Sequence, residues 1–188
     1  MADTNIRSEV LSKLDGDTSI NYEGKAESVK AFDKTHSKTN LIRIIVLSVI
    51  GIALTVLYIV KASSSSVAII VILLLSFLYG AFAEVIASGK LKKAKYYITD
   101  RHIVADLDSS FNVIPLSSIE KYRFEKDVDG HDYLIIGDCK KGMYGLRSLS
   151  TVSARFSEDK KCTESVFYAM SDFDKFKKVF EEQLAKAK

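Results

Sequence analysis

The sequence has few of the residues from which metal and redox sites are built. It holds two cysteines, Cys139 and Cys162, and three histidines, His36, His102 and His131. The cysteines lack the CxxC spacing of zinc and thiol-redox sites, and no histidine cluster accompanies them. The histidines are far apart along the chain, and none belongs to an HExxH-type array. These features disfavour a zinc or redox centre, and two reduced cysteines suit a cytosolic domain.

Sequence motifs of common enzyme classes are also missing. The chain contains no GxSxG, Walker, GxGxxG or protein-kinase signature. Four acids surround one predicted turn without the loop spacing of a calcium site, and we interpret them as solvated turn residues. They are Asp127, Asp129, Asp132 and Asp138. The sequence thus indicates no catalytic residue, cofactor or metal. The net charge of +3 is too small for a general nucleic-acid-binding surface.

The most prominent feature that is present is a pair of apolar runs. The first covers residues 41–60, and the second covers residues 67–83 and continues weakly to Ala87. Each is close to the roughly 20 residues that a helix needs to cross about 30 Å of hydrocarbon. The connection of residues 61–66 allows only a tight turn. These lengths predict a transmembrane helical hairpin over residues 41–88, whose first helix is an uncleaved anchor because the preceding residues do not resemble a signal peptide.

Positive charges flank the predicted hairpin on one side. They stand before the first run, in its first turn and after the second run, at Lys34, Lys38, Arg43, Lys90, Lys92, Lys93 and Lys95. The connection between the runs contains only Lys61. The positive-inside rule therefore predicts a cell-membrane protein with two spans and both termini in the cytoplasm. The lysines after the second run either serve only as topology anchors or also attract anionic lipids, at about 1 kcal/mol each.

Polar residues within the two runs are few. Glu84 is the one acid at membrane depth, and we expect it to lie at the cytoplasmic interface, paired with Lys90 or water. Such a pair does not make an ion pathway, so a channel or transporter is disfavoured. Small residues around Gly51 and Gly80 favour close packing of the two helices within one hairpin over packing between two chains.

The sequence after the second run predicts an antiparallel β-domain over residues 92–188. Apolar residues alternate with period two in segments 94–99, 102–107, 111–116, 119–128, 131–138, 151–157 and 164–170. Asp129-Gly130 is a typical hairpin turn. These short strands predict a small β-sandwich or partly open barrel.

The pattern changes to a helical period after Ser171, which we expect to be an N-cap. One apolar stripe follows, consisting of Phe173, Phe176, Phe180 and Leu184. A stripe of this kind is typical of a helix that packs on a sheet. The fold class predicted for the chain is therefore α+β, with a helical membrane hairpin followed by a β-domain capped by a C-terminal helix.

Two short motifs of the β-domain resemble the bacterial pleckstrin-homology-like domain of many short bacterial membrane proteins. Residues 97–103, YITDRHI, are similar to the Y-x-x-T-x-x-R type opening hairpin of that family, and residues 114–119, IPLSSI, resemble its I-P-L-x-x-I step into a long strand. The resemblance covers residues 92–185 and implies a PH-like fold. The chain departs from the pattern at His102, where the family often has a second arginine, and in a longer basic segment over residues 140–147. A shared fold does not fix the ligand.

Basic side chains near the membrane are the candidate contacts for lipids or for a partner. They are Lys90, Lys92, Lys93, Lys95, Arg101, Lys140, Lys141 and Arg147. The last three, together with Tyr144, form either a loop that touches headgroups or an acidic partner, or a solvated loop, which is favoured. An incompletely closed sheet would leave residues 94–107 as an edge for self-association.

The N-terminal tail, residues 1–40, is mostly polar. Four apolar residues line one narrow helical face: Ile6, Val10, Leu11 and Leu14. A tail that is disordered and orders only on contact is favoured over a stable helix.

Three functional hypotheses follow. The favoured one is a non-catalytic module at the inner leaflet that binds protein partners or itself. The alternative is a sensor of anionic lipids or envelope stress. An enzyme or transporter subunit is the distant third.

Overall fold

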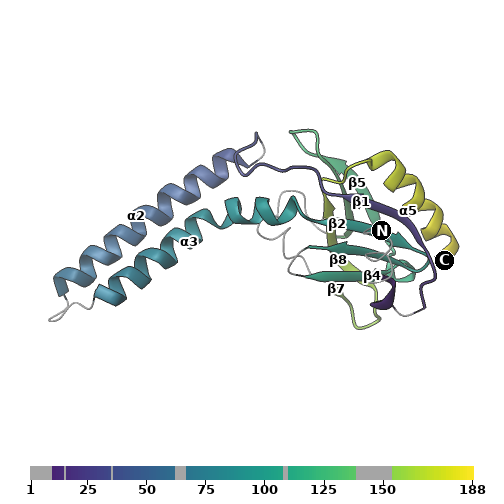
Figure 1. The fold of residues 1–188 in the computed structure, drawn as a ribbon, viewed down its shortest axis with the longest axis horizontal. Coiled ribbons are helices and arrows are strands. Elements are labelled where there is room, and N and C mark those ends of the chain that lie inside the picture. The colour runs from purple at the N-terminus through teal and green to yellow at the C-terminus, as the bar shows by residue number, and fades with distance from the viewer. Residues whose placement is uncertain (1–9, 15, 35, 62–66, 108–109, 139–153) are drawn as a thin grey trace, which may run out of the picture.

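The computed structural model consists of a helical pair that projects from one end of a β-domain (Figure 1). It describes residues 10–14, 16–34, 36–61, 67–107, 110–138 and 154–188. Helices α2 (Ser37–Lys61) and α3 (Val67–Leu91) run antiparallel, side by side. Within the described residues, α2 is the one unbroken helix that is long and apolar enough to cross a membrane.

Helix α3 differs from the straight second span that the sequence predicts. Its two parts, Ala68–Gly80 and Phe82–Leu91, are bent by 53° relative to each other, and they satisfy the same criterion only if they are counted as one span. Gly80 lies at the bend, and a residue without Cβ weakens a helix. The prediction of two clear spans is therefore met by one clear span and one bent candidate.

The β-domain consists of two open, four-stranded antiparallel sheets. The first has the order β1 (Ile20–Lys25), β2 (Lys95–Thr99), β3 (His102–Asp106), β4 (Phe111–Pro115). The second has the order β5 (Tyr122–Lys126), β6 (Asp132–Gly137), β8 (Cys162–Tyr168), β7 (Arg155–Phe156). The 3₁₀ turn η1 (Leu116–Ser118) connects the sheets. The antiparallel α+β class is confirmed, and in the described part of the chain the sheets stay open instead of closing into a barrel.

Each of the seven predicted strands has a counterpart, β2 to β8 (Cys162–Tyr168), and two are much shorter than predicted. The strand expected over 119–128 is reduced to β5, because η1 occupies the residues just before Ile119. The strand expected over 151–157 appears only as β7, and residues 151–153 lie outside the described part. Gly130 has a φ of +89°, as the predicted hairpin turn requires.

Strand β1 comes from the segment that the sequence predicts to be a disordered tail, and that prediction is wrong. It pairs with β2 from Ile20 opposite Thr99 to Lys25 opposite Lys95. The helical pair is therefore inserted between two neighbouring strands of one sheet. Because β2 and β3 each have a partner on both sides, residues 94–107 are interior, and the prediction of a free edge there is wrong as well.

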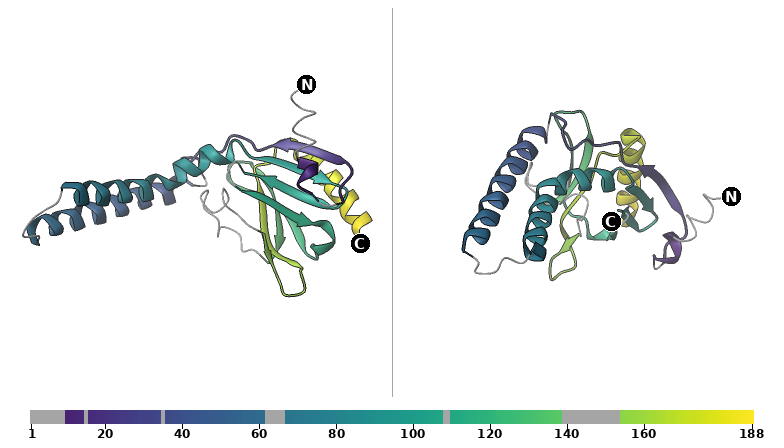
Figure 2. Two further views of the ribbon diagram at one scale, coloured as in Figure 1. Left: turned by 60° about the horizontal axis from the view of Figure 1, so that its bottom comes forward. Right: turned by 60° about the vertical axis from the view of Figure 1, so that its left-hand side comes forward.

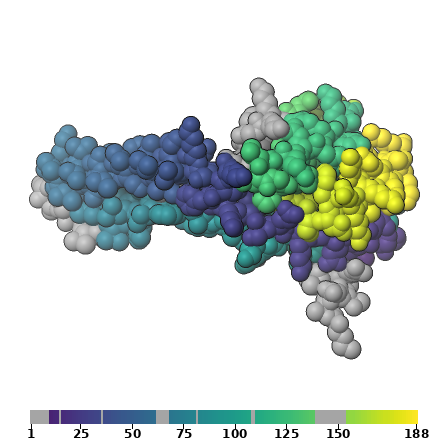
Figure 3. Space-filling model, turned by 90° about the horizontal axis from the view of Figure 1, so that it is seen from above, coloured from purple at the N-terminus to yellow at the C-terminus, as the bar shows by residue number. Residues whose placement is uncertain are grey.

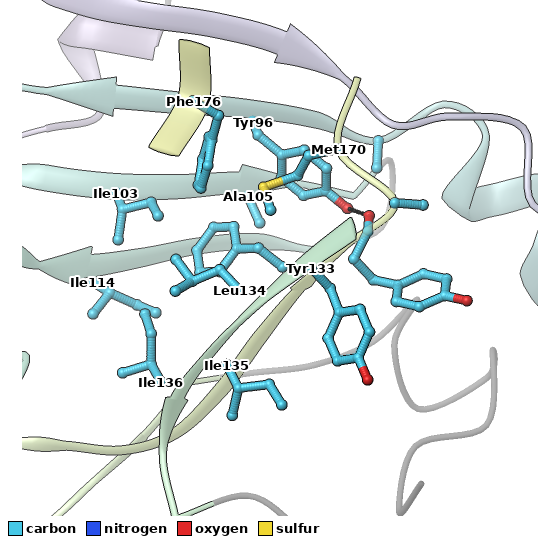
Figure 4. Close-up of a cluster of buried hydrophobic side chains, with 14 of the residues drawn as sticks. Tyr96, Ile103, Ala105, Ile114, Tyr133, Leu134, Ile135, Ile136, Met170 and Phe176 are labelled. Carbon is cyan, nitrogen blue, oxygen red and sulfur yellow. Dashed lines mark hydrogen bonds between the residues drawn. The ribbon is translucent and has the colours of Figure 1, made fainter. Parts of the chain in front are cut away.

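The core lies between the two sheets and is covered by helix α5 (Phe173–Ala187). Figure 4 shows side chains of both sheets pointing toward one another, with Phe176 of α5 above them. Phe176 and Phe180 are fully buried, which confirms the predicted apolar stripe. The ring centres of Tyr22 in β1 and Phe176 are 5.2 Å apart. Those of Tyr122 in β5 and Phe180 are 5.1 Å apart. Helix α5 thus spans the opening between β1 and β5.

Ser171 has a different role from the predicted N-cap. The N-cap is Asp172, with a φ of +54° and no capping hydrogen bond from its side chain. The Ser171 hydroxyl donates to the carbonyl of Lys25, and the backbone N–H of Ser171 donates to the same oxygen at 3.0 Å. The start of α5 is therefore fastened to the end of β1.

We expect residues 92–188 alone to be unstable, because without β1 the edge of β2 and the ring of Phe176 lose their cover. Adding a peptide of residues 16–31 should raise the thermal midpoint of the fragment, measured by circular dichroism. The same peptide with Tyr22→Ala should raise it less. A fragment whose midpoint is high and unaffected by the peptide would show that β1 is dispensable.

Candidate functional site

The candidate site is the junction where the helical pair meets the β-domain, and its geometry begins with close packing of the helices. A Cβ atom on Gly51 of α2 would lie 2.8 Å from Cγ of Phe77 in α3, so only glycine fits there. Further along, a Cβ atom added to Gly80 would lie 3.7 Å from Cδ1 of Leu47, an ordinary van der Waals contact. Small residues thus allow the helices to approach each other, as the sequence predicts. Figure 3 shows them packed along their length.

An ion pair fixes the register of the helices near the β-domain. The Arg43 guanidinium donates to the Glu84 carboxylate, and Glu84 is only 5% exposed. The main contact of Glu84 is therefore with Arg43, and the prediction that Glu84 pairs with Lys90 or water is wrong. Antiparallel packing places the first turns of α2 beside the last turns of α3, which the pattern of either helix alone does not reveal.

The helices are joined to the β-domain by a continuous apolar core. Ala87 and Leu91 at the end of α3 are buried in the same cluster as Val29 and Ala31 of the segment before α2. The side-chain amide of Asn40 donates to the carbonyl of Ala31. The orientation of the helices relative to the sheets is therefore set by packing.

Polar side chains from distant parts of the chain gather around Tyr168 of β8. Its hydroxyl donates to Asp127, which follows β5. The rings of His36 and His131 lie 6.3 and 6.1 Å from the Tyr168 ring. Burial, followed by the Asp127 hydrogen bond, raises the pKa of the Tyr168 phenol well above its usual range. Tyr168 is therefore a neutral hydrogen-bond donor at physiological pH.

Each histidine of this group is held by a carboxylate. His36 Nδ1 lies 2.9 Å from Asp33, and His131 Nδ1 lies 2.8 Å from Glu27. Both acids belong to the segment between β1 and α2. The sequence separates His36 from His131, and only the fold brings them to one tyrosine. No three histidine, cysteine or acidic side chains form a metal-binding group within the described residues.

Two of the turn acids are also bound, against the prediction that they are solvated. Asp127 Oδ1 accepts the backbone N–H groups of Asp129 and His131 at 2.9 and 2.8 Å. Asp129 accepts the N–H of Lys34 at 3.1 Å. The β5–β6 turn is therefore attached to the segment that leads into α2. Asp132 and Asp138 instead pair with surface lysines.

The structure separates the predicted contact residues into groups. Lys90 lies in the last turn of α3, Lys92 and Lys93 follow it, and Lys95 begins β2. These four lysines, called the basic collar below, lie together at the junction. Arg101 lies at the opposite end of β2, away from the helices. Lys140, Lys141 and Arg147 lie outside the described residues.

A polar clasp holds the N-terminal strand at the Arg101 end. Asp100 accepts hydrogen bonds from Thr18, Ser19 and Asn21, and these bonds hold the pKa of its carboxyl well below the usual range. In the other direction, Asp17 accepts the backbone N–H of Arg101 at 3.0 Å and lies 2.6 Å from the His102 ring nitrogen. Arg101 and His102 line an open groove here with Lys186 of α5.

Comparison with known proteins gives no match from which a function could be inferred, so the functional proposal below rests on the geometry of the junction. No protein family, curated protein or solved structure matches this chain.

A double-mutant cycle tests the Arg43–Glu84 pair. Arg43→Ala and Glu84→Ala should each lower the free energy of unfolding in detergent micelles, because each leaves a charge unpaired. The double variant should lose less than the sum, with a coupling of about 0.5–3 kcal/mol. The matched cycle of Lys61→Ala with Glu84→Ala, at opposite ends of the helical pair, should be additive. Additivity of the Arg43 cycle as well would contradict the pairing.

Proposed function

We propose that the chain is a non-catalytic, membrane-anchored binding module. Two transmembrane helices hold a pleckstrin-like β-domain against the cytoplasmic leaflet, and the domain binds protein partners or a second copy of itself. The single observation that carries this proposal is the pairing of β1 with β2 on either side of the inserted helices.

The exposed surface of the helices supports the membrane anchor. Only 11% of the most apolar stretch of α2 is buried inside the protein. Side chains such as Val49 and Val60 are 61% and 75% exposed. On α3, Leu75 is 60% exposed. The core helix of a water-soluble protein buries such side chains, since exposing them to water is unfavourable by about 1.5–3 kcal/mol each. A lipid environment removes this cost.

The strand pairing supports two spans over one. The chain leaves the sheet at Ala26 and returns at Ala94, and these residues are joined by a backbone hydrogen bond of 2.9 Å. Because β1 and β2 belong to one sheet, both lie on the same side of any membrane. The chain between them therefore crosses an even number of times. If α2 crosses, α3 must return, and its bend is part of that second span.

The charge pattern supports a cytoplasmic β-domain. The basic collar lies where the second span ends, and Lys34 and Lys38 lie where the first begins. Under the positive-inside rule, this charge distribution supports a cytoplasmic location for this end and for both termini.

The architecture is consistent with the pleckstrin-like resemblance. Two antiparallel sheets with a C-terminal helix over their open side are what that resemblance implies. In this chain the first sheet also contains β1, which lies outside the resembling residues 92–185. The polar groups around Tyr168 bind one another, which suits a structural joint better than a catalytic site.

The basic collar favours anionic-lipid binding as the second candidate function. Its lysines lie at headgroup level if α3 spans the membrane, and each would contribute about 1 kcal/mol of attraction. In that case the domain senses the lipid composition of the leaflet.

Thiol labelling in whole cells tests the two-span topology. In a chain with Cys139→Ser and Cys162→Ala, Lys61→Cys at the end of α2 should react with a membrane-impermeant reagent. Lys25→Cys and Lys95→Cys should stay unlabelled until the cells are opened. Labelling of Lys25→Cys and Lys95→Cys on opposite sides would contradict the even number of crossings.

Affinity purification of the intact protein in mild detergent, with mass spectrometry of proteins and lipids, separates the two functions. Protein binding predicts that a partner or a second copy co-purifies without enrichment of anionic lipids. Lipid binding predicts enrichment of anionic lipids that the variant Lys92→Gln/Lys93→Gln loses. Lys186→Gln/Lys188→Gln, with the same charge change at the far end, is the control. If neither a protein partner nor anionic lipids are enriched, both functions are refuted.

A further inference from the structure

A polar groove with a volume of about 520 Å³ opens at the end of the β-domain that lies away from the helices. We call it the distal groove. Its walls come from the β2–β3 turn, from the residues around η1 and from the last turn of α5. Figure 1 and the left view of Figure 2 show the end of α5 opposite the helical pair. The polar side chains of the lining are Asp100, Arg101, His102, Ser117 and Lys186.

The carboxylate in this lining is already occupied by the clasp. Asp100 Oδ1 accepts the Ser19 hydroxyl at 2.7 Å and the Asn21 amide at 3.0 Å. Asp100 Oδ2 accepts the Thr18 hydroxyl at 2.6 Å and the backbone N–H of Ser19 at 3.0 Å. Because both oxygens are used, Asp100 makes no ion pair with the neighbouring Arg101. Among the described residues, the Arg101 guanidinium has no hydrogen-bond or ion-pair partner.

The position of the Arg101 guanidinium depends on a glycine. A Cβ atom on Gly16 would lie 2.7 Å from Nη1 and 3.4 Å from Cζ of Arg101. A side chain at residue 16 would therefore displace the guanidinium from its present place. Gly16 also has a φ of +81°, a left-handed conformation that favours glycine. An arginine positioned in this way can donate two parallel hydrogen bonds to an oxyanion.

His102 presents one ring nitrogen in a defined orientation. Its Nδ1 lies 2.6 Å from Oδ2 of Asp17, a carboxylate with no exposed surface. The other oxygen of Asp17 accepts the backbone N–H of Arg101 at 3.0 Å. A hydrogen bond at one ring nitrogen of a histidine determines which role the other nitrogen plays. The imidazole of His102 lines the distal groove, so Nε2 is the nitrogen that a ligand can use.

Two further polar groups of the groove are unpaired. They are the ammonium of Lys186, in the last turn of α5, and the hydroxyl of Ser117, in η1. Neither side chain bonds to another residue in the part of the chain that the structure describes. The distal groove thus combines two cations, a hydroxyl and an oriented imidazole, while the acids beside it bind the clasp. Such a set of donors suits a negatively charged ligand with several oxygens.

We propose that the distal groove binds a small phosphate monoester. A tetrahedral phosphate has three terminal oxygens, and the groove offers donors from three separate elements. The Arg101 fork binds two oxygens, Lys186 pairs with the third, and His102 and Ser117 complete the site. A planar carboxylate has only two oxygens and engages fewer of these groups. The volume falls within the usual range for small-molecule sites, about 300–1,000 Å³, which leaves room for the rest of the ligand.

Phosphate monoesters occur both in soluble compounds and in the headgroup of phosphatidic acid. The position of the distal groove favours the soluble source. The helices leave the opposite end of the domain, so the groove faces away from the bilayer that they would cross (Figure 1). This step rests on the proposed membrane anchor, whereas the set of donors does not depend on it.

Calorimetric titration of the full chain in detergent micelles with phenyl phosphate tests the site. Wild type should bind one equivalent. Arg101→Gln/Lys186→Gln should weaken binding by about tenfold or more, because charge-assisted hydrogen bonds are lost. Lys92→Gln/Lys93→Gln, with the same charge change in the basic collar, is the control and should bind as wild type does. Both groove side chains are exposed, so circular dichroism should show an unchanged thermal midpoint. If the double variant is unfolded, Lys186→Gln alone should still weaken binding.

Competition experiments define the ligand class. Inorganic phosphate should displace phenyl phosphate, and acetate at the same ionic strength should not. The proposal is overturned if neither phosphate compound binds, if acetate competes equally, or if the collar variant weakens binding as much as the groove variant.

Nanodiscs distinguish the two sources of the phosphate group. Affinity for phenyl phosphate should be the same in discs of phosphatidylcholine with and without phosphatidic acid. Loss of binding in discs that contain phosphatidic acid would assign the groove to a headgroup and overturn the soluble source. Labelling of Lys61→Cys reports separately on the anchor, because binding in micelles does not require a membrane-spanning topology.

Discussion

The pairing of β1 with β2 is the interaction on which the rest of the structure depends. The two strands are neighbours in the sheet although both helices lie between them in the sequence. Closing a long connection costs free energy that grows only slowly with its length. Antiparallel packing of α2 and α3 reduces that cost further, because it brings the start of one helix beside the end of the other. The two helices therefore form an insertion whose two ends lie close together. Strand β1 in turn holds α5, through Tyr22 against Phe176 and through Lys25 bound to Ser171.

The same pairing makes the junction a joint with a defined orientation. The segment between β1 and α2 is fixed to the domain by packing at Val29 and by hydrogen bonds to the β5–β6 turn. Arg43 and Glu84 then fix one helix against the other. If the helices span a membrane as we propose, a domain held in this way keeps a constant face toward the bilayer, which suits the proposed binding module.

Local patterns in the sequence were sufficient to predict most of the fold. Period-two alternation located β2, β3, β4, β6 and β8, and the phenylalanine stripe located α5, because each signal is contained within a few residues. Strand β1 was missed because its six residues, INYEGK, contain a single fully buried side chain, Tyr22. Its position is decided by partners that come much later in the chain.

The candidate site was less predictable for the same reason. The basic collar is contiguous in sequence and stays together, whereas Arg101 is separated from it by the length of β2. The partner of Glu84, and the meeting of His36 and His131 at Tyr168, depend on contacts between distant segments. The one signal in the sequence for this group of side chains is the presence of polar residues, such as Asp33 and His36, shortly before a predicted span.

A disulfide between the two strands tests the central claim most directly. Lys25 and Lys95 are opposite each other in the register. A chain with Lys25→Cys, Lys95→Cys, Cys139→Ser and Cys162→Ala, integrated into membranes and resistant to alkaline extraction, should form an internal disulfide on mild oxidation. Its formation is predicted because both strands belong to one sheet while the helices are inserted. If the integrated protein does not form this disulfide, although Lys25→Cys and Lys95→Cys each still form a mixed disulfide with a small disulfide reagent, the account is contradicted.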